Sequence, residues 1–307
     1  MEKTAYKNRI KLLLLLLCVS SCLTGCATVI TQMIEEQTVS KWPEARTQEE
    51  VTETEVTETM TESVQSTEPV NEDAGVTPQT QSSGNVQAQT EASLSGSGNL
   101  VPDYVRTSYD YETYHFEWES RDGAYDFYID LPVDMNVYRY YSSLDRYLGT
   151  ANYLNYIGDA YNEEMVEQIV YAFEQIRDDT GYSQADMVRE IIHFVQVEFT
   201  YQSDDEVYGV QDYPKYPIET VVERSGDCED TAFLAASIIR DMGYGAALLI
   251  MDSHCAVGVK GDESLSGTYY AVDGVRYYYV ETTNVGYEIG MTPDNIDTSS
   301  ARVYVLP

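Results

Sequence analysis

At residues 225–242 the chain reads Ser-Gly-Asp-Cys-Glu-Asp-Thr-Ala-Phe-Leu-Ala-Ala-Ser-Ile-Ile-Arg-Asp-Met. Apolar residues recur at helical spacing from Ala232 to Met242, and Gly243 ends the pattern. The stretch therefore predicts a helix with Cys228 in its first turn. Free backbone N–H groups and the dipole at a helix start favour a thiolate and can hold an oxyanion. We interpret Cys228 as a nucleophile rather than a buried structural cysteine, because it follows a glycine turn and has acidic neighbours.

Two further residues lie where predicted strands begin and end. His254 opens the run His-Cys-Ala-Val-Gly-Val, and Glu281 closes the run Arg-Tyr-Tyr-Tyr-Val-Glu. If these strands are antiparallel, the start of one lies beside the end of the other, so the imidazole meets the carboxylate. The order cysteine, histidine, acid then supplies a thiol nucleophile, its base and the group that orients the base. Asp252 and Asp273 remain alternatives for the acid.

These motifs resemble those of the transglutaminase-like superfamily of papain-type cysteine enzymes. The resemblance covers residues 201–290, with Gly-Asp-Cys at the helix start, His254 at the strand start, and Glu-Thr-Thr at 281–283 where the family usually has Asp-Pro-Thr. It is strongest to a prokaryotic branch that has Tyr-Pro-x-x-Thr before Gly-Asp-Cys-Glu-Asp-Thr, and residues 216–220 supply the first of these motifs. The resemblance implies a transglutaminase-like or papain-like α+β core with the catalytic helix packed on an antiparallel sheet. It also implies a thioacyl intermediate on Cys228.

Residues 1–25 are interpreted as a lipoprotein signal peptide. Four basic side chains precede or border the apolar run 12–17, which is too short to span a bilayer. Leu-Thr-Gly-Cys then resembles a bacterial lipobox, which implies that Cys26 carries a lipid and anchors the mature chain to the outer side of the cell membrane. Only Cys228 and Cys255 would remain in the folded part. Because side chains alternate along a strand, Cys255 is expected to face away from Cys228 and to form no disulfide with it.

Residues 26–100 are predicted to be a disordered acidic tether. Thr, Glu, Ser, Gln and Gly dominate the composition, and no basic residue lies between Arg46 and Arg106. Such a segment buries too little apolar surface to fold. As a coil it has a mean reach on the order of 45 Å. Whether the tether also binds partners stays open.

The folded unit is expected to start near residue 101, because 27 of the 28 tyrosines lie beyond position 103. Alternating apolar residues around Arg-Asp-Gly at 121–123 predict a hairpin. Periodic apolar residues predict one helix over 163–181 and a second over 183–195, which Ser183 caps. The order hairpin, helices, catalytic helix and strands predicts an α+β fold. We assign 101–160 to a β-rich extension and 161–307 to the catalytic domain.

Other polar residues near these motifs are weaker candidates for a catalytic or metal-binding role. His115 and His193 are interpreted as structural. Gln196 and Gln202 are both candidates for a second oxyanion donor beside the backbone N–H of the nucleophile, and the sequence does not choose between them. The acids at 204–206 are interpreted as a solvated loop, because no segment has EF-hand or zinc-site spacing. We therefore expect neither a metal nor a cofactor.

Charge restricts the partners. The chain has a formal net charge of −34, and residues 101–307 contain 38 acidic against 12 basic side chains. This balance disfavours nucleic acid and anionic wall polymers and favours a neutral or cationic peptide or protein substrate. We expect an acyl-transfer enzyme that acts on peptide or glutamine carbonyls, with hydrolysis by a protease or amidase favoured over crosslinking, because bulk water needs no binding site. The alternative is a non-catalytic peptide- or protein-binding module on the same fold.

Overall fold

The computed structural model describes residues 8–9, 85–86, 89–90, 104–146 and 149–307. Cys26 and nearly all of the predicted signal peptide and tether lie outside these residues. Within those two segments the structure describes only two-residue strands: β1 (Asn8–Arg9), β2 (Asn85–Val86) and β3 (Gln89–Thr90). Among the described residues, none of the helices combines the length and the apolar character of a membrane-spanning segment.

A hairpin and two long helices form the first half of the folded part. β4 (Tyr111–Glu119) pairs antiparallel with β5 (Tyr125–Asp134), so the predicted hairpin is confirmed. The two predicted helices are α3 (Ala160–Thr180), which Gly181 ends in the left-handed conformation, and α4 (Gln184–Glu198). The serine that precedes α4 accepts a hydrogen bond from a first-turn N–H, which is the cap that the sequence predicts.

Trp118 fixes the hairpin to these helices. Its ring packs against Phe173 of α3 and Phe194 of α4, with ring centroids 6.0 and 4.8 Å away. Its indole N–H donates a 2.8 Å hydrogen bond to the buried carboxylate of Glu190. The hairpin therefore contributes to the same hydrophobic cluster as the helices.

Short elements connect the hairpin and the helices to the helix that starts at Cys228. The last of them, β7, pairs parallel with β6 and leads directly into α7 (Cys228–Asp241). These connecting elements are α2 (Met135–Ser142), η1 (Thr150–Tyr156), β6 (Thr200–Tyr201), α5 (Asp204–Val207), α6 (Pro217–Glu223) and β7 (Ser225–Gly226).

The second half of the folded part is a sheet whose central five strands are antiparallel. The strand order is β2-β10-β11-β9-β8-β12-β3, and the two outermost short strands pair parallel with their neighbours. A short helical turn, η2 (Thr298–Ser300), precedes the last strand. The central strands are β8 (Ala246–Met251), β9 (His254–Gly261), β10 (Tyr269–Val272), β11 (Val275–Val280) and β12 (Arg302–Val305).

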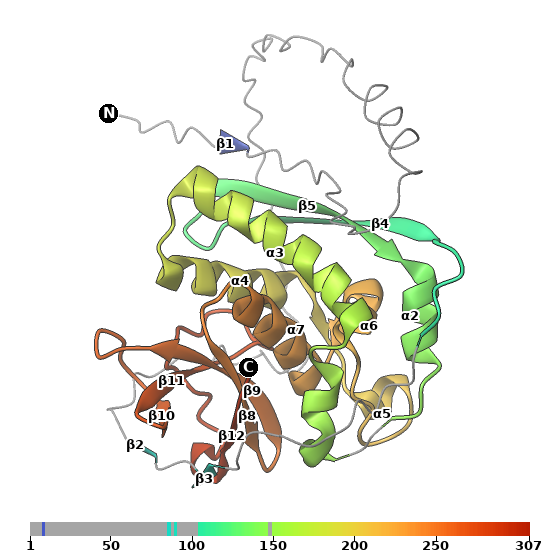
Figure 1. The fold of residues 1–307 in the computed structure, drawn as a ribbon. Coiled ribbons are helices and arrows are strands. Elements are labelled where there is room, and N and C mark those ends of the chain that lie inside the picture. Colours follow the sequence, from blue (N-terminus) through green and yellow to red (C-terminus); the bar gives the residue numbers. More distant parts are fainter. Residues whose placement is uncertain (1–7, 10–84, 87–88, 91–103, 147–148) are drawn as a thin grey trace, which may run out of the picture. The chain divides into compact units, whose positions relative to one another are not determined.

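Helix α7 lies between this sheet and the helices α3 and α4 (Figure 1). Every residue from 229 to 239 is buried, and each large apolar side chain in that run contributes about 1.5–3 kcal/mol through burial. Alternate residues of β8 and β9 face α7, and the intervening residues form a second cluster on the opposite face of the sheet. The predicted α+β class, with helices packed on an antiparallel sheet, is confirmed.

Candidate active site

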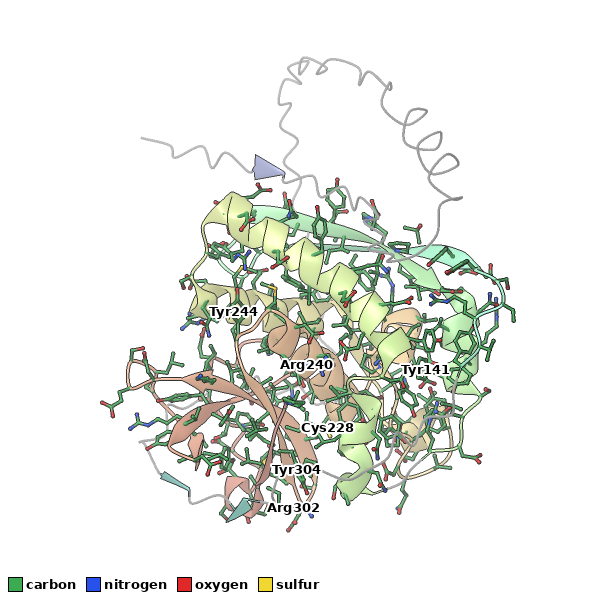
Figure 2. The ribbon with its side chains drawn as sticks, in the orientation of Figure 1. Tyr141, Cys228, Arg240, Tyr244, Arg302 and Tyr304 are labelled. Carbon is green, nitrogen blue, oxygen red and sulfur yellow. The ribbon has the colours of Figure 1, made fainter. Side chains whose placement is uncertain are left out.

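Cys228 is the first residue of α7, as the sequence predicts. Figure 2 labels it near one end of this helix, with Arg240 near the other. Asp227 is the N-cap, and its backbone N–H donates to Oδ2 of Asp230 at 3.4 Å. The thiol therefore projects from a helix start, where free backbone N–H groups can donate hydrogen bonds to a negatively charged oxygen.

A buried lysine and a glycine hold the turn before Cys228. Lys215 is 1% exposed; its Nζ donates to the carbonyl oxygen of Ser225 at 3.0 Å and lies 3.9 Å from Oδ2 of Asp230. The Lys215 backbone N–H also donates to Oδ1 of Asp230 at 2.7 Å. A Cβ on Gly226 would lie 2.5 Å from the Cβ of Asp230, so only glycine allows the turn to approach the carboxylate this closely.

His254 and Glu281 meet at one end of the central strands, where β9 begins and β11 ends. β9 and β11 pair antiparallel, and Nε2 of His254 lies 2.9 Å from Oε2 of Glu281, which directly follows β11. The Glu281 side chain is fully buried; the Tyr279 hydroxyl donates to its Oε2 at 2.7 Å, and the Thr283 N–H and hydroxyl donate to its Oε1 at 2.9 and 2.6 Å. Burial alone would raise the pKa of Glu281, but the bonds from His254 and Thr283 lower it to about 2. Glu281 is therefore an anion at neutral pH.

The two alternative acids lie elsewhere. Asp252 is exposed in the turn between β8 and β9, where its backbone N–H donates to Ser300. Asp273 is in the β10–β11 turn with a φ of 49°. Within the described part of the chain, the imidazole of His254 makes its side-chain hydrogen bond with Glu281 alone, which leaves Nδ1 for another partner.

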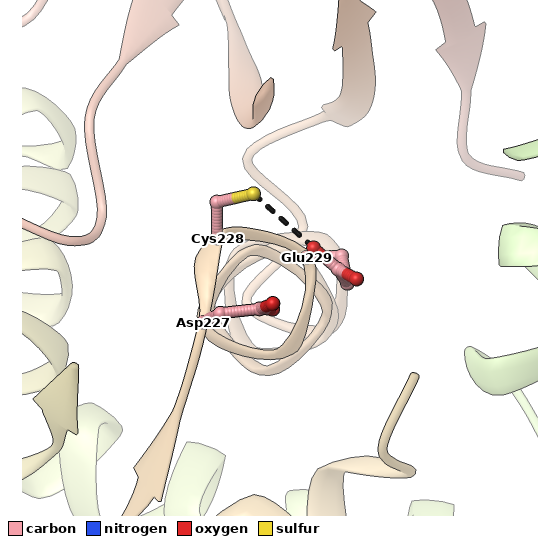
Figure 3. Close-up of side chains that lie close together, drawn as sticks. All are labelled: Asp227, Cys228 and Glu229. Atoms are coloured by element: carbon pink, nitrogen blue, oxygen red, sulfur yellow. Dashed lines mark hydrogen bonds between the residues drawn. The ribbon is translucent and has the colours of Figure 1, made fainter. Parts of the chain in front are cut away.

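The thiol of Cys228 is bonded to its sequence neighbour. Sγ donates to Oε2 of Glu229 at 3.1 Å (Figure 3), and the Tyr153 hydroxyl donates to the other oxygen of Glu229 at 3.3 Å. Burial, followed by the charge of Glu229 and the proximity of Cys255 and Asp227, raises the pKa of the Cys228 thiol. Burial first, and then the adjacent carboxylates, therefore oppose the effect that the helix start is expected to have on this thiol.

The position of Cys255 contradicts the expectation that its side chain faces away from Cys228. It is buried in the layer between the sheet and α7, and Cys228 packs against the same layer, so Cys255 faces the helix rather than away from it. The alternation along β9 is as predicted, but it places His254 on the other side, where the strand start reaches Glu281. Both cysteines are free thiols, as expected. Among the described residues, no hydrogen bond joins Cys228 to His254.

The two glutamine candidates have different positions. Gln196 donates through Nε2 to the backbone oxygen of Glu281 at 2.8 Å, so it ties α4 to the end of β11. Gln202 is exposed and directly follows β6, and its backbone N–H donates to the carbonyl oxygen of Gly226, before α7, at 3.1 Å. His193 bonds to a backbone oxygen of the hairpin and His115 is exposed. The identity of a second oxyanion donor remains a prediction with two candidates.

A group of carboxylates beside the thiol was missed by sequence reasoning. Oxygen atoms of Asp204, Asp212 and Glu229 lie within 4.8 Å of one another, and Asp227, Cys228 and Glu229 form a second such group. Asp204 is only 4% exposed, which corrects the interpretation of this residue as part of a solvated loop, whereas Asp205 and Glu206 are exposed. Carboxylate oxygens are ligands that hard cations use. These residues come from three segments, so their spacing along the chain carries no metal-site pattern.

Comparisons with known proteins give one partial likeness. No protein-family model matches the chain, and no curated protein matches it. Four chains of solved structures match. One of them, titled "Crystal structure of a TGase", is 13% identical to this chain with a TM-score of 0.30, and the match covers 50% of this chain and 38% of that chain. This chain thus spans well under half the length of the structure that it matches.

Proposed function

We propose that this protein is a cysteine acyl-transfer enzyme that acts on peptide or glutamine carbonyls through a thioacyl intermediate. The observation that carries the proposal is the pair formed by His254 and the buried, ionised Glu281 at 2.9 Å. A carboxylate held by three further hydrogen bonds orients the imidazole and stabilises it when it takes a proton. The resemblance of the cysteine, histidine and acid motifs to the transglutaminase-like superfamily supports the same core and chemistry.

The reaction begins when Sγ of Cys228 gives its proton to Nδ1 of His254. The thiolate attacks the carbonyl carbon, and the Cys228 backbone N–H donates to the oxyanion that forms. The imidazolium then protonates the departing amine or ammonia as the C–N bond breaks, which leaves a thioester on Cys228. Water attacks the thioester while the imidazole takes its proton, and the acid product leaves with the thiol restored. An amine in place of water gives a crosslink instead.

For this first step the thiol must leave Glu229. The proposal therefore requires a movement that breaks the Sγ–Oε2 bond and brings the thiol to the imidazole. We favour hydrolysis because water needs no binding site. The strongly acidic composition favours neutral or cationic peptides as substrates.

The test is the rate at which iodoacetamide labels Cys228 across pH, measured by mass spectrometry. We expect Cys228→Ala to lose the label, Cys255→Ala to keep it, and His254→Ala to label much more slowly near neutral pH. Equal rates in the parent and in His254→Ala would contradict a catalytic pair. Incubation with a glutamine-containing peptide then separates the outcomes, since hydrolysis and amine transfer give products of different mass.

One observation favours a non-catalytic peptide- or protein-binding module instead. The Cys228 thiol is protonated and bonded to Glu229, and it makes no hydrogen bond to His254 among the described residues. A binding module should alkylate with the pH profile of a buried, high-pKa thiol, whether or not His254 is present. The same labelling series therefore distinguishes the two functions.

Anchoring at the outer membrane surface through Cys26 belongs to the proposal and rests on the lipobox-like sequence. Metabolic labelling with a fatty-acid analogue should mark the expressed protein, and Cys26→Ser should prevent it. A Cys26→Ser protein that still carries the label would refute this assignment.

A further inference from the structure

A cavity of about 280 Å³ lies between α4, the hairpin turn and the loop that follows Glu281. Helix α4 contributes Arg189, His193 and Gln196, whose spacing places them on one helix face. Arg121 from the hairpin turn contributes a second guanidinium group. The rest of the lining is mostly apolar and comprises Val280, Val285, Gly286, Tyr287 and Ile289.

The two guanidinium groups converge on one carboxylate. Arg121 forms an ion pair with Oε1 of Glu288, and Nε of Arg189 lies 3.5 Å from Oε2 of the same residue. Arg189 also contacts Asp186 at 3.2 Å. Among the described residues that line the cavity, two are cationic and none is acidic, in a chain with a net charge of −34. A carboxylate is thus the group that this arrangement already binds.

His193 adds a polar group without adding charge. Its Nε2 lies 3.1 Å from the carbonyl oxygen of Glu119. Burial, together with the nearby charge of Arg121, lowers the pKa of His193, so the ring is neutral at neutral pH. A neutral ring that donates from Nε2 presents an acceptor at Nδ1.

The size and lining of the cavity restrict its ligand. Pockets for small molecules typically measure roughly 300–1,000 Å³, so this cavity takes a group of about one amino-acid residue. Val280, Val285 and Ile289 offer apolar contacts next to the guanidinium groups. The complementary ligand therefore has a carboxylate at one end and an apolar side chain beside it.

We propose that this cavity binds a carboxylate attached to an apolar residue, such as the C-terminal residue of a peptide, and that Glu288 occupies the two guanidinium groups until the ligand replaces it. The choice of a peptide rests on the proposed function, whereas the carboxylate specificity does not. Gln196 lines the cavity and also donates to the backbone oxygen of Glu281. A ligand in this position would lie beside the strand end that carries the acid of the candidate triad.

Binding is tested with N-acetyl-leucine as the carboxylate probe and N-acetyl-leucinamide as the matched uncharged probe. Isothermal titration calorimetry on the Cys228→Ala protein measures both without turnover, so the result is independent of catalysis. We expect the acid to bind at least about tenfold more tightly than the amide, and added salt to weaken its binding. Arg189→Gln should weaken binding of the acid by a similar factor.

Glu288→Gln gives the decisive result, because it removes the competing carboxylate and should strengthen binding of the acid. Arg177→Gln is the control, since Arg177 lies on α3 and pairs only with acids of its own helix among the described carboxylates. Equal affinity for acid and amide, no gain in Glu288→Gln, or equal losses in Arg189→Gln and Arg177→Gln would each overturn the proposal. Acyl transfer that persists alongside such a result would leave the proposed function intact.

Discussion

Replacing Glu281 by glutamine should destabilise the protein in a strongly pH-dependent way. The pKa of Glu281 is about 2, against an ordinary value of 4.5. This difference stabilises the folded state by about 3 kcal/mol above about pH 5, where the carboxylate is ionised in both states. Because the folded pKa is the lower one, the stabilisation is lost as the pH falls, and only about 1 kcal/mol remains at pH 3.

The assay is urea unfolding of the parent and Glu281→Gln at pH 7 and at the lowest pH where both fold. We expect the difference in unfolding free energy to shrink by more than half between pH 7 and pH 3. Glu263→Gln is the matched control, because Glu263 has a side chain that is 86% exposed and should show no such change. A difference that stays constant with pH would refute the view that the ionised Glu281 is what His254 and Thr283 stabilise.

Three further predictions concern the helix start. Glu229→Gln should lower the pKa of Cys228 and speed its alkylation at neutral pH, because a repelling carboxylate is removed; an unchanged alkylation profile would contradict this. Gly226→Ala should cost about 1–3 kcal/mol in urea unfolding, since its Cβ would overlap Asp230; a neutral result would mean that the turn relaxes freely. Lys215→Met should destabilise the protein by about 3–5 kcal/mol in urea unfolding, because it removes the buried cation that lies 3.0 Å from Oε2 of Glu223 and 3.9 Å from Oδ2 of Asp230; an unchanged unfolding free energy would exclude a stabilising role for this cation.

Local patterns in the sequence predicted the elements whose formation depends on nearby residues. The hairpin around Gly123, the cap at Ser183 and the helix start at Cys228 all follow from turn, capping and periodicity signals within a few residues. The antiparallel register that joins His254 to Glu281 was also predictable, because a strand start and a strand end coincide in that geometry.

The features that the sequence did not reveal depend on contacts between distant segments. The partner of the Cys228 thiol could not be chosen, because a side chain at a helix start can rotate toward the next residue or toward a strand. The burial of Lys215 depends on a turn that folds over it. The cavity beside Gln196 is formed by three segments, among them the hairpin turn with Arg121, and no spacing along the chain brings these together.

The buried indole of Trp118 allows unfolding around the hairpin to be measured separately from unfolding of the layer between α7 and the sheet. It lies against α3 and α4, while Cys228 and Cys255 lie at the layer between α7 and the sheet. The chain has two tryptophans, and Trp42 lies outside the described residues, so a Trp42→Phe protein would emit from Trp118 alone. Its fluorescence then follows the release of the hairpin, and cysteine alkylation under the same urea series follows the opening of the sheet layer. Coincident transitions would show that the hairpin and the layer between α7 and the sheet unfold as a single cooperative unit. Separate transitions would show that residues 101–160 are an extension with its own stability.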